Sequence, residues 1–418
     1  MMSIAVSPID RSVAKYSRSD TNLRKNVTNR LLADIRGLAP RIAARAGEIE
    51  AARRIPLDLV EALRSIGVFR MFAPQSHGGL ELDLPSGLEV IAALGRIDGS
   101  VGWSVMIGSV GSMFAALLPR ETYERVYEND PDVIVAGSIQ PAGTAEATSG
   151  GWRVGGRWPF ASGCQHADWM VGFCVMTEGG KPLPGEGGRP LVRGVFLPAG
   201  DWQIEDTWYA MGLKGTGSHH IGLKDKLVPA ANFFDFENGA PCLPGPLYQA
   251  VPHLLPLFHC AIDVGLAEGA LDDLLTLADT GRQQFRAAVP MREAELFQFE
   301  LGRIAADLKA ARASLEVQAA SHWRHALAGT LKDEAHFIQG TQTGIWVATT
   351  CARVADACFT LAGGSAVYES SPLQRRLRDL HTVAQHATIH QRHYVAAGKS
   401  ALAQFRRRLE EPSQLAAE

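Results

Sequence analysis

Several familiar signals are missing from this sequence of 418 residues, and each absence excludes a class of protein. The six cysteines form no C-x-x-C pair and follow no regular spacing, so neither a disulfide framework nor a zinc ribbon is indicated. No uninterrupted apolar run approaches 18 residues, and Met1–Asp20 lacks an apolar core of signal-peptide length. We therefore expect a cytoplasmic protein with no membrane segment.

Charge and short motifs exclude further classes. The formal net charge of −3 offers no electrostatic footprint for nucleic acid or for an anionic membrane surface. No G-x-G-x-x-G string follows a predicted strand, so the sequence does not predict NAD(P)H binding. His166 and Asp168 have no third ligand nearby, and we assign no metal site.

The patterning that is present divides the chain into three parts. Apolar residues recurring at helical spacing predict a helical domain over residues 28–130, after a loose arm over 1–27. Short β-rich runs follow over 131–245, where Gly155-Gly156 has the form of a two-residue hairpin turn. Four long helices are expected over 246–410, before a tail over 411–418. Their expected spans are Phe258–Leu277, Phe297–Leu315, Phe337–Leu361 and His381–Leu402.

Two strings in the β region carry most of the chemical information. Gly151–Trp169 contains W-P-F-A-S-G, and Asp206–Ser218 ends in G-L-K-G-T-G-S. In each string a hydroxyl residue (Ser162, Thr216 or Ser218) stands beside glycines. Such groups suit a flat heteroaromatic ring laid against backbone and hydroxyls, although two ordinary strands with glycine-rich turns would give the same composition.

Together, in this order and spacing, the strings resemble those of the flavin-dependent two-component monooxygenases, the oxygen-using branch of the acyl-CoA dehydrogenase superfamily. The resemblance runs from about Leu31 to about Leu402. It implies a mainly α fold with a central β domain: an N-terminal helical domain, a middle β-barrel or sandwich and a C-terminal four-helix bundle.

The resemblance also implies an activity. In this branch a separate NAD(P)H:flavin reductase supplies reduced flavin (FMN or FAD). The flavin reacts with O2 to give a C4a-hydroperoxyflavin that hydroxylates a small aromatic substrate such as a phenol, an indole or a polycycle. Two other functions stay open: an acyl-CoA dehydrogenase-type flavoenzyme, and a non-catalytic flavin-binding protein.

The resemblance assigns two catalytic residues. Ser162 would face the N5 edge of the flavin through its hydroxyl or its backbone N–H. When Arg378-Asp379 is matched to the superfamily's R-D pair, the dehydrogenase glutamate falls on Ala387, which disfavours α-proton abstraction. The adjacent His386 matches the histidine of the oxygenases, with His381 and His390 as alternatives if the match slips by a turn.

The remaining expected contacts also come from the resemblance. Arg282 resembles a pyrophosphate contact made across a dimer interface, and we therefore expect a homo-oligomer, either a dimer or a tetramer. Several members carry another histidine some residues after a G-W pair, but Ser104–Leu118 contains none. The expected substrate pocket comprises Trp103, Trp208 and Phe258. The expected cofactor contacts are Ser138, Gln140, Ala142, Phe160, Ser162, Gly163, Thr216, Ser218, Arg282, Gly363 and Gly364.

Overall fold

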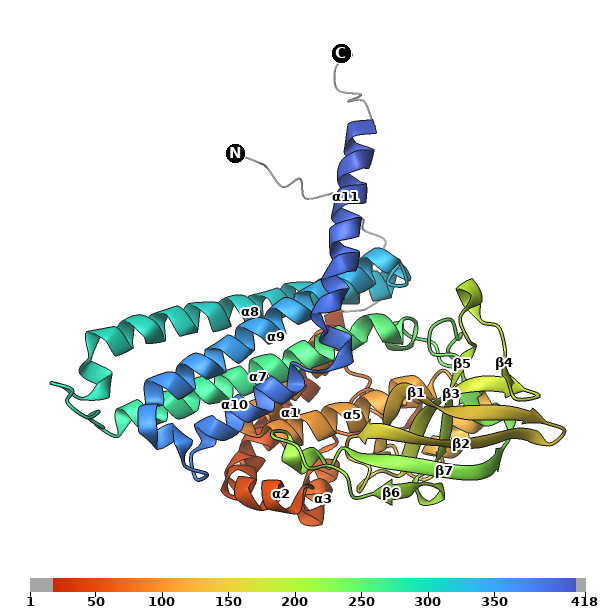
Figure 1. The fold of residues 1–418 in the computed structure, drawn as a ribbon, viewed down its shortest axis with the longest axis horizontal. Helices are drawn as coiled ribbons and strands as arrows, with labels where there is room; N and C mark the ends of the chain where they lie inside the picture. The colour runs from red at the N-terminus through yellow and green to blue at the C-terminus, as the bar shows by residue number, and fades with distance from the viewer. Residues whose placement is uncertain (1–17, 411–418) are drawn as a thin grey trace.

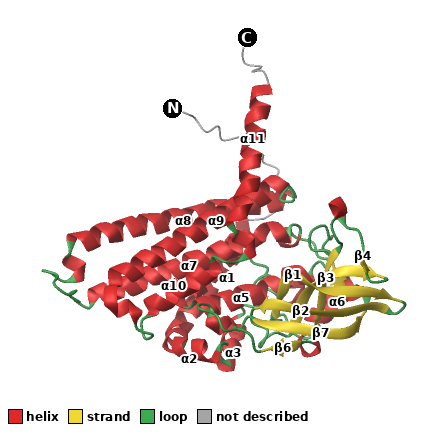
Figure 2. Ribbon diagram, viewed as in Figure 1, coloured by secondary structure: helices red, strands yellow, loops and turns green. Residues whose placement is uncertain are grey.

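The computed structural model of this protein describes residues 18–410 and shows three successive parts (Figure 1). N-terminal helices lead into one sheet, and the chain then returns to long helices that lie beside one another (Figure 2). This order of helices, sheet and bundle confirms the predicted architecture.

The N-terminal part is held by an apolar face that begins on α1 (Arg18–Ala44), where Leu31, Ile35 and Ile42 are fully buried. Because α1 begins at Arg18, the expected loose arm is wrong for residues 18–27, and the earlier residues lie outside the described range. The helix continues through Pro40 and ends four residues later. The other helices of this part are α2 (Ala46–Ala52), α3 (Leu57–Ile66), α4 (Leu84–Ile97), α5 (Gly99–Ala115) and α6 (Arg120–Tyr127).

The middle part is one eight-stranded mixed sheet with the order β6-β7-β2-β1-β3-β5-β8, with β4 paired to β3. Only the β1–β3 pair is parallel among the described strands. The strands are β1 (Val135–Thr148), β2 (Gly151–Ala161), β3 (Trp169–Glu178), β4 (Lys181–Pro182), β5 (Val192–Pro198), β6 (Gln203–Glu205), β7 (His219–Val228) and β8 (Phe233–Phe234).

The predicted hairpin turn at Gly155-Gly156 is wrong. The chain turns between Thr148 and Gly151, and β2 continues through both glycines. Gly156 serves close packing: a Cβ built on it would lie 2.5 Å from the Cα of Gly143 and 2.9 Å from the ring of Trp158. That ring is fully buried in the sheet's own core, and its Nε1 donates to Phe173 O at 2.7 Å.

The C-terminal part is built on α7 (Val251–Asp279), α8 (Glu295–Ala328) and α9 (Glu334–Ala362). The expected fourth helix, His381–Leu402, is wrong: α10 (Pro372–Val383) ends first, two short turns follow, and α11 (Tyr394–Glu410) then projects from the body (Figure 1). His386 and His390 lie in this break. By length and composition α7 and the segment Glu334–Val367 resemble membrane spans, but 83% of the apolar window in α7 is buried inside the protein.

Candidate active site

A continuous chain of side-chain hydrogen bonds joins α5 to the two predicted strings. Trp103 Nε1 donates to Ser162 Oγ at 2.9 Å, and Ser162 Oγ lies 2.7 Å from Ser218 Oγ. Ser218 Oγ lies 2.6 Å from Thr216 Oγ1, which donates to Leu213 O at 2.8 Å. All three hydroxyl residues are buried. The structure therefore brings together Ser162, Thr216 and Ser218, as the strings suggested.

The direction of this chain follows from the single proton on each hydroxyl. Thr216 uses its proton on Leu213 O, so Ser218 is the donor to Thr216, and Ser162 is the donor to Ser218. The backbone N–H of Ser162 is also engaged, since it donates to Phe160 O at 2.9 Å. Ser162 thus has no donor left for a ligand and retains one lone pair on Oγ. These contacts therefore disfavour a hydrogen bond donated by Ser162 to a flavin.

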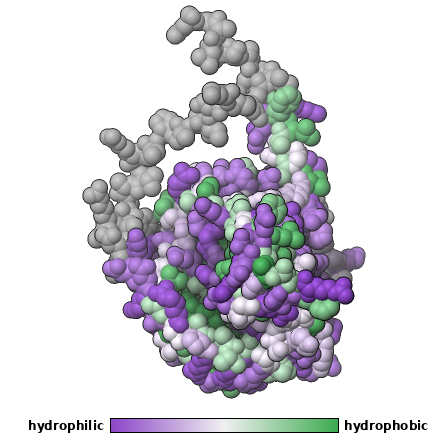
Figure 3. All heavy atoms as spheres, turned by 90° about the vertical axis from the view of Figure 1, so that its left-hand side faces the viewer, coloured by the Kyte–Doolittle hydropathy of each residue, from purple (hydrophilic) through white to green (hydrophobic). Residues whose placement is uncertain are grey.

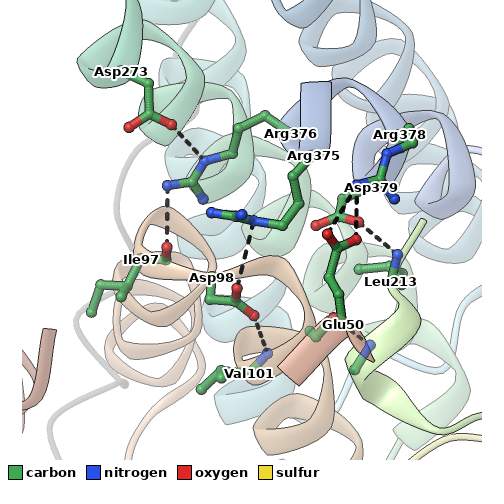
Figure 4. Close-up of polar contacts among 12 residues, drawn as sticks. Glu50, Ile97, Asp98, Val101, Leu213, Asp273, Arg375, Arg376, Arg378 and Asp379 are labelled. Carbon is green, nitrogen blue, oxygen red and sulfur yellow. Dashed lines mark hydrogen bonds and ion pairs between the residues drawn. The ribbon is translucent and has the colours of Figure 1, made fainter. Parts of the chain in front are cut away.

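The loop that carries Thr216 and Ser218 is fixed by α10 (Figure 4). Asp379 Oδ1 accepts the backbone N–H of Leu213 at 2.6 Å, and Gly215 N donates to Ser100 Oγ at 3.1 Å. A Cβ on Gly212 would lie 2.2 Å from Arg378 O, so only glycine allows this approach. The loop is therefore clamped between α5 and α10.

The clamp on α10 contains an unusual carboxyl. Asp379 is buried near Asp98, and burial, reinforced by that second acid, raises the pKa of Asp379 to about 7. Asp98 caps α5 through Val101 N at 3.0 Å, and Arg375 lies 4.0 Å from it. The R-D pair of the sequence is thus a structural clamp that orients the hydroxyl loop (Figure 4).

Two histidines of the bundle also contact Trp103. The ring centroid of Trp103 is 5.7 Å from that of His386 and 5.2 Å from that of His259, and the two imidazoles lie 4.2 Å apart with a tilt of 35°. Burial lowers the pKa of His386 to about 4 and holds the pKa of His259 well below its usual range. Both rings are therefore neutral near pH 7.

The proton of His386 can be placed by its neighbour. The backbone N–H of Thr388 donates to His386 Nδ1 at 3.2 Å, so the neutral ring carries its proton on Nε2. His386 accordingly offers a donor at Nε2. The alternatives lie elsewhere: His381 Nε2 is 2.8 Å from Asp356 Oδ1 on α9, and His390 is exposed and accepts from Arg392 N at 3.1 Å.

His259 is the residue that the sequence reasoning missed. It stands in an apolar stretch of α7 between Phe258 and Cys260, where a histidine usually indicates core packing. It is only 5% exposed, and its Nδ1 has no hydrogen-bond partner among the described residues. A lone histidine within an apolar helix was the available signal, but its spatial neighbours come from distant segments.

The surface beside Ser162 fits a flat aromatic group. Phe160 is 62% exposed and has a φ of +64°, an uncommon conformation for an aromatic residue that is often found at functional sites. The β1–β3 ladder shifts register between Ser138 and Gly143, so the exposed segment 139–142 bulges from the sheet. An apolar ring face and unpaired strand backbone are thus available together, and Gln140 and Ala142 lie on the bulge.

Not every predicted pocket residue joins this group. Trp208 packs at 6.3 Å against Phe160 and donates from Nε1 to Leu213 O at 3.0 Å, so it lies on the Phe160 side. Phe258 is 1% exposed, and its ring meets that of Phe72 at 5.3 Å. The contacts of Phe258 are those of a core residue, and the neighbouring His259 reaches the site instead.

The loop that follows α7, which contains Arg282, and the Gly363-Gly364 turn that follows α9 lie at the end of the bundle away from the sheet (Figure 1). Gln284 Nε2 donates to Leu361 O at 2.8 Å, which ties the two segments. Within one chain they do not meet Ser162. This separation agrees with a contact made to a second subunit's cofactor, which stays a prediction.

No group of three or more His, Cys, Asp or Glu side chains able to hold a metal occurs within residues 18–410. The six cysteines are all free, and five of them are buried. Asp168, considered above with His166, instead accepts the backbone N–H of Ile134 at 2.8 Å.

Two segments of the chain match known protein families. Residues 31–120 match the family described as acyl-CoA dehydrogenase, N-terminal domain, and residues 257–391 match acyl-CoA dehydrogenase, C-terminal domain. The matched segments contain Trp103, His259 and His386.

Individual relatives are similar over most of their length. Indole-3-acetate monooxygenase of Pseudomonas putida is 33% identical over 359 residues, 85% of this chain and 89% of the relative. The oxygenase component of FADH(2)-dependent resorcinol hydroxylase of Rhizobium is 29% identical, over 86% of this chain and 90% of the relative. The crystal structure of 3-HSA hydroxylase from Rhodococcus superposes with a TM-score of 0.81 at 27% identity, over 90% of this chain and 97% of that structure.

Proposed function

Because this chain belongs to the flavin-dependent monooxygenase branch of the acyl-CoA dehydrogenase superfamily, we propose that it is the oxygenase component of a two-component system that hydroxylates a small aromatic compound. A separate reductase supplies its reduced flavin, FMN or FAD, and O2 is the second substrate. The observation that supports this most directly is Trp103, which joins the Ser162 hydroxyl chain to the His259–His386 pair.

The residues present suit a reduced flavin. Phe160 offers an exposed ring face, and the β1 bulge offers backbone groups for the polar edge of the flavin. The free lone pair of Ser162 can only accept, and reduced flavin carries an N–H at N5 that can donate to it. Bound there, the flavin supplies the activation of oxygen, while the protein orients it and excludes water.

The histidine side acts on the oxygen and the substrate. His386 presents Nε2–H as a donor, the form suited to hydrogen-bond an oxygen that is being transferred. The dehydrogenase reaction lacks its base, since residues 385–390 contain no carboxylate. The aromatic substrates named for the relatives, an indole and a resorcinol, indicate the class that we expect here.

The active form is a homo-oligomer, a dimer or a tetramer, in the cytoplasm. Helix α11 projects from the body with apolar surface along it, including Val395, Leu402 and Phe405, each more than half exposed (Figure 3). Phe285, beside Arg282, is 89% exposed. Such surface is typical of an interface. Light scattering should give two or four times 45.0 kDa, and a monomer that binds flavin tightly would contradict this.

The activity is tested with reduced flavin and a panel of phenols and indoles. We expect oxygen uptake, a hydroxylated product and tighter binding of reduced than of oxidised flavin. Acyl-CoA should leave bound oxidised flavin unreduced. If flavin oxidation yields only hydrogen peroxide with every aromatic compound tested, the protein binds flavin but is not a hydroxylase.

A further inference from the structure

Gly108 and Gly111 of helix α5 have no room for a side chain as large as the second histidine that several family members carry after the G-W pair. A Cβ built on Gly111 would lie 2.1 Å from the Cβ of Val135, and one built on Gly108 would lie 3.0 Å from the ring of Phe69. The first distance is too short for any side chain without a shift of the backbone, and the second requires a fully buried neighbour to move. These two positions of α5 are thus used for close packing against Phe69 and against Val135 of β1.

His386 does not fill this role in its present form. Its Nδ1 lone pair is occupied by the N–H of Thr388, and its Nε2 carries the proton. A neutral imidazole in this tautomer can donate but has no free lone pair to receive a proton. A substrate that must lose an O–H or N–H proton therefore needs another acceptor.

We infer that His259 of α7 is this acceptor and that the stacked pair divides the work, His386 donating and His259 receiving the substrate's proton. The inference rests on the proposed function, because it takes the substrate to be a phenol or an indole. The substrate O–H or N–H bond breaks and its electron pair stays on the substrate. The proton forms a new N–H bond at the ring nitrogen of His259 that carries no proton, and the ring becomes a cation.

The surroundings of His259 agree with this assignment. It contacts both Trp103 and His386, with ring centroids at 5.2 Å and 4.2 Å. It is buried and has no hydrogen bond that would commit it to a structural role among the described residues. A cation formed there would stack on a neutral ring and face the new substrate anion, and in a buried site that attraction is strong.

The test uses a probe and no flavin. 4-Nitrophenol absorbs visible light only as the phenolate, so the bound spectrum shows where the proton lies. We expect the wild-type protein to bind it as the phenolate near pH 6, where the free probe is mainly protonated. His259→Phe keeps an aromatic ring and should bind the probe as the neutral phenol, with loss of the phenolate absorbance. His259→Gln, which preserves a polar side chain, should do the same.

A matched control makes the result specific. His322→Phe, which removes another buried histidine, from α8, should still bind the phenolate. The inference is overturned if wild type does not bind the probe or binds it as the phenol, or if both His259 variants bind the phenolate. Failure of the proposed function would appear separately, as an absence of hydroxylated product with reduced flavin and oxygen in the wild-type protein.

Discussion

The two sides of Trp103 differ in how their polar groups are satisfied. On the sheet side, Ser162, Ser218 and Thr216 use every hydroxyl proton inside the protein, and the chain ends on Leu213 O. On the bundle side, His259 Nδ1 and both carboxyl oxygens of Asp263, one turn further along α7, are buried without a hydrogen-bond partner among the described residues.

This difference separates positioning from chemistry. A fully paired network holds its members in one arrangement, which suits a surface that must orient a cofactor. An unpaired buried polar group costs roughly 1–3 kcal/mol, and it persists where a ligand or a reaction makes use of it. Substitutions on the two sides should therefore have different signatures: lost order on the sheet side, and lost chemistry on the bundle side.

The largest effect is expected for His386→Ala. Loss of the Nε2–H donor should lower hydroxylation by roughly 10²–10⁴-fold, the range for an acid–base group, while binding of reduced flavin remains. The oxygen consumed should reappear as hydrogen peroxide. The measurement is product and peroxide formed per flavin oxidised.

His381→Ala is the matched control for that variant. His381 lies on α10, before the break that contains His386, and it pairs with Asp356. Its loss should therefore leave the amount of hydroxylated product per flavin oxidised unchanged. If His381→Ala loses activity and His386→Ala keeps it, the assignment of the histidine is wrong by more than a turn.

On the sheet side, Ser162→Ala should produce a mixed effect. It leaves Trp103 Nε1 and the hydroxyl of Ser218 with one partner fewer, at a cost of about 1–3 kcal/mol in the free energy of unfolding. It also removes the acceptor for N5–H, so the peroxide share should rise. Thr216→Val breaks the far end of the same chain and should lower stability with a smaller change in peroxide. If wild type and Ser162→Ala form the same share of hydrogen peroxide per flavin oxidised, the role of Ser162 is structural only.

The sequence indicated which hydroxyl residues of the sheet side lie together, because these residues are close in sequence or on paired strands. Ser162, Thr216 and Ser218 each lie in a short string whose glycines permit close packing, and the strings are joined by β2–β7 pairing. The hairpin at Gly155-Gly156 failed for a related reason. A glycine serves close approach as readily as a turn, and only the position of the Trp158 ring shows that Gly156 does the former.

The bundle side could be predicted only in part. His386 follows a recognisable R-D pair, but its tautomer depends on Thr388 N in a break that periodicity did not indicate. His259 meets it through the packing of α7 against the segment after α10, two elements more than a hundred residues apart in sequence. Helical spacing predicts which face of α7 is buried, but it does not indicate that a distant histidine will stack on that face.

The variant Asp263→Leu tests whether an unpaired polar group on the bundle side lowers the stability of the protein. Burial holds the pKa of Asp263 well above its usual range, and the side chain has no hydrogen bond among the described residues. Leucine has the same branching and no polar atoms, so we expect the free energy of unfolding to rise by about 1–3 kcal/mol. Denaturant unfolding of both flavin-free proteins measures it. A destabilised Leu variant with a stable Asp263→Asn would show that the carboxyl has a polar partner.

The smallest effect concerns the pH dependence of stability. The pKa of His386 is lowered to about 4 in the folded protein, against about 6.5 for an unperturbed histidine. Unfolding therefore takes up a proton between these values, and this contribution to stability is complete above about pH 6.5 and is lost as the pH falls towards 4. The change in the free energy of unfolding is limited to about 1.4 kcal/mol per pH unit.

The raised pKa values of Asp263 and Asp379 change stability in the opposite direction, but both residues are present in the two proteins that we compare. Relative to wild type, His386→Phe should thus lose less stability between pH 6.5 and 4.5, as measured by denaturant unfolding at each pH. Parallel curves would mean that the imidazole titrates as it does in the unfolded chain, and the neutral donor form of His386 would then no longer follow from its burial.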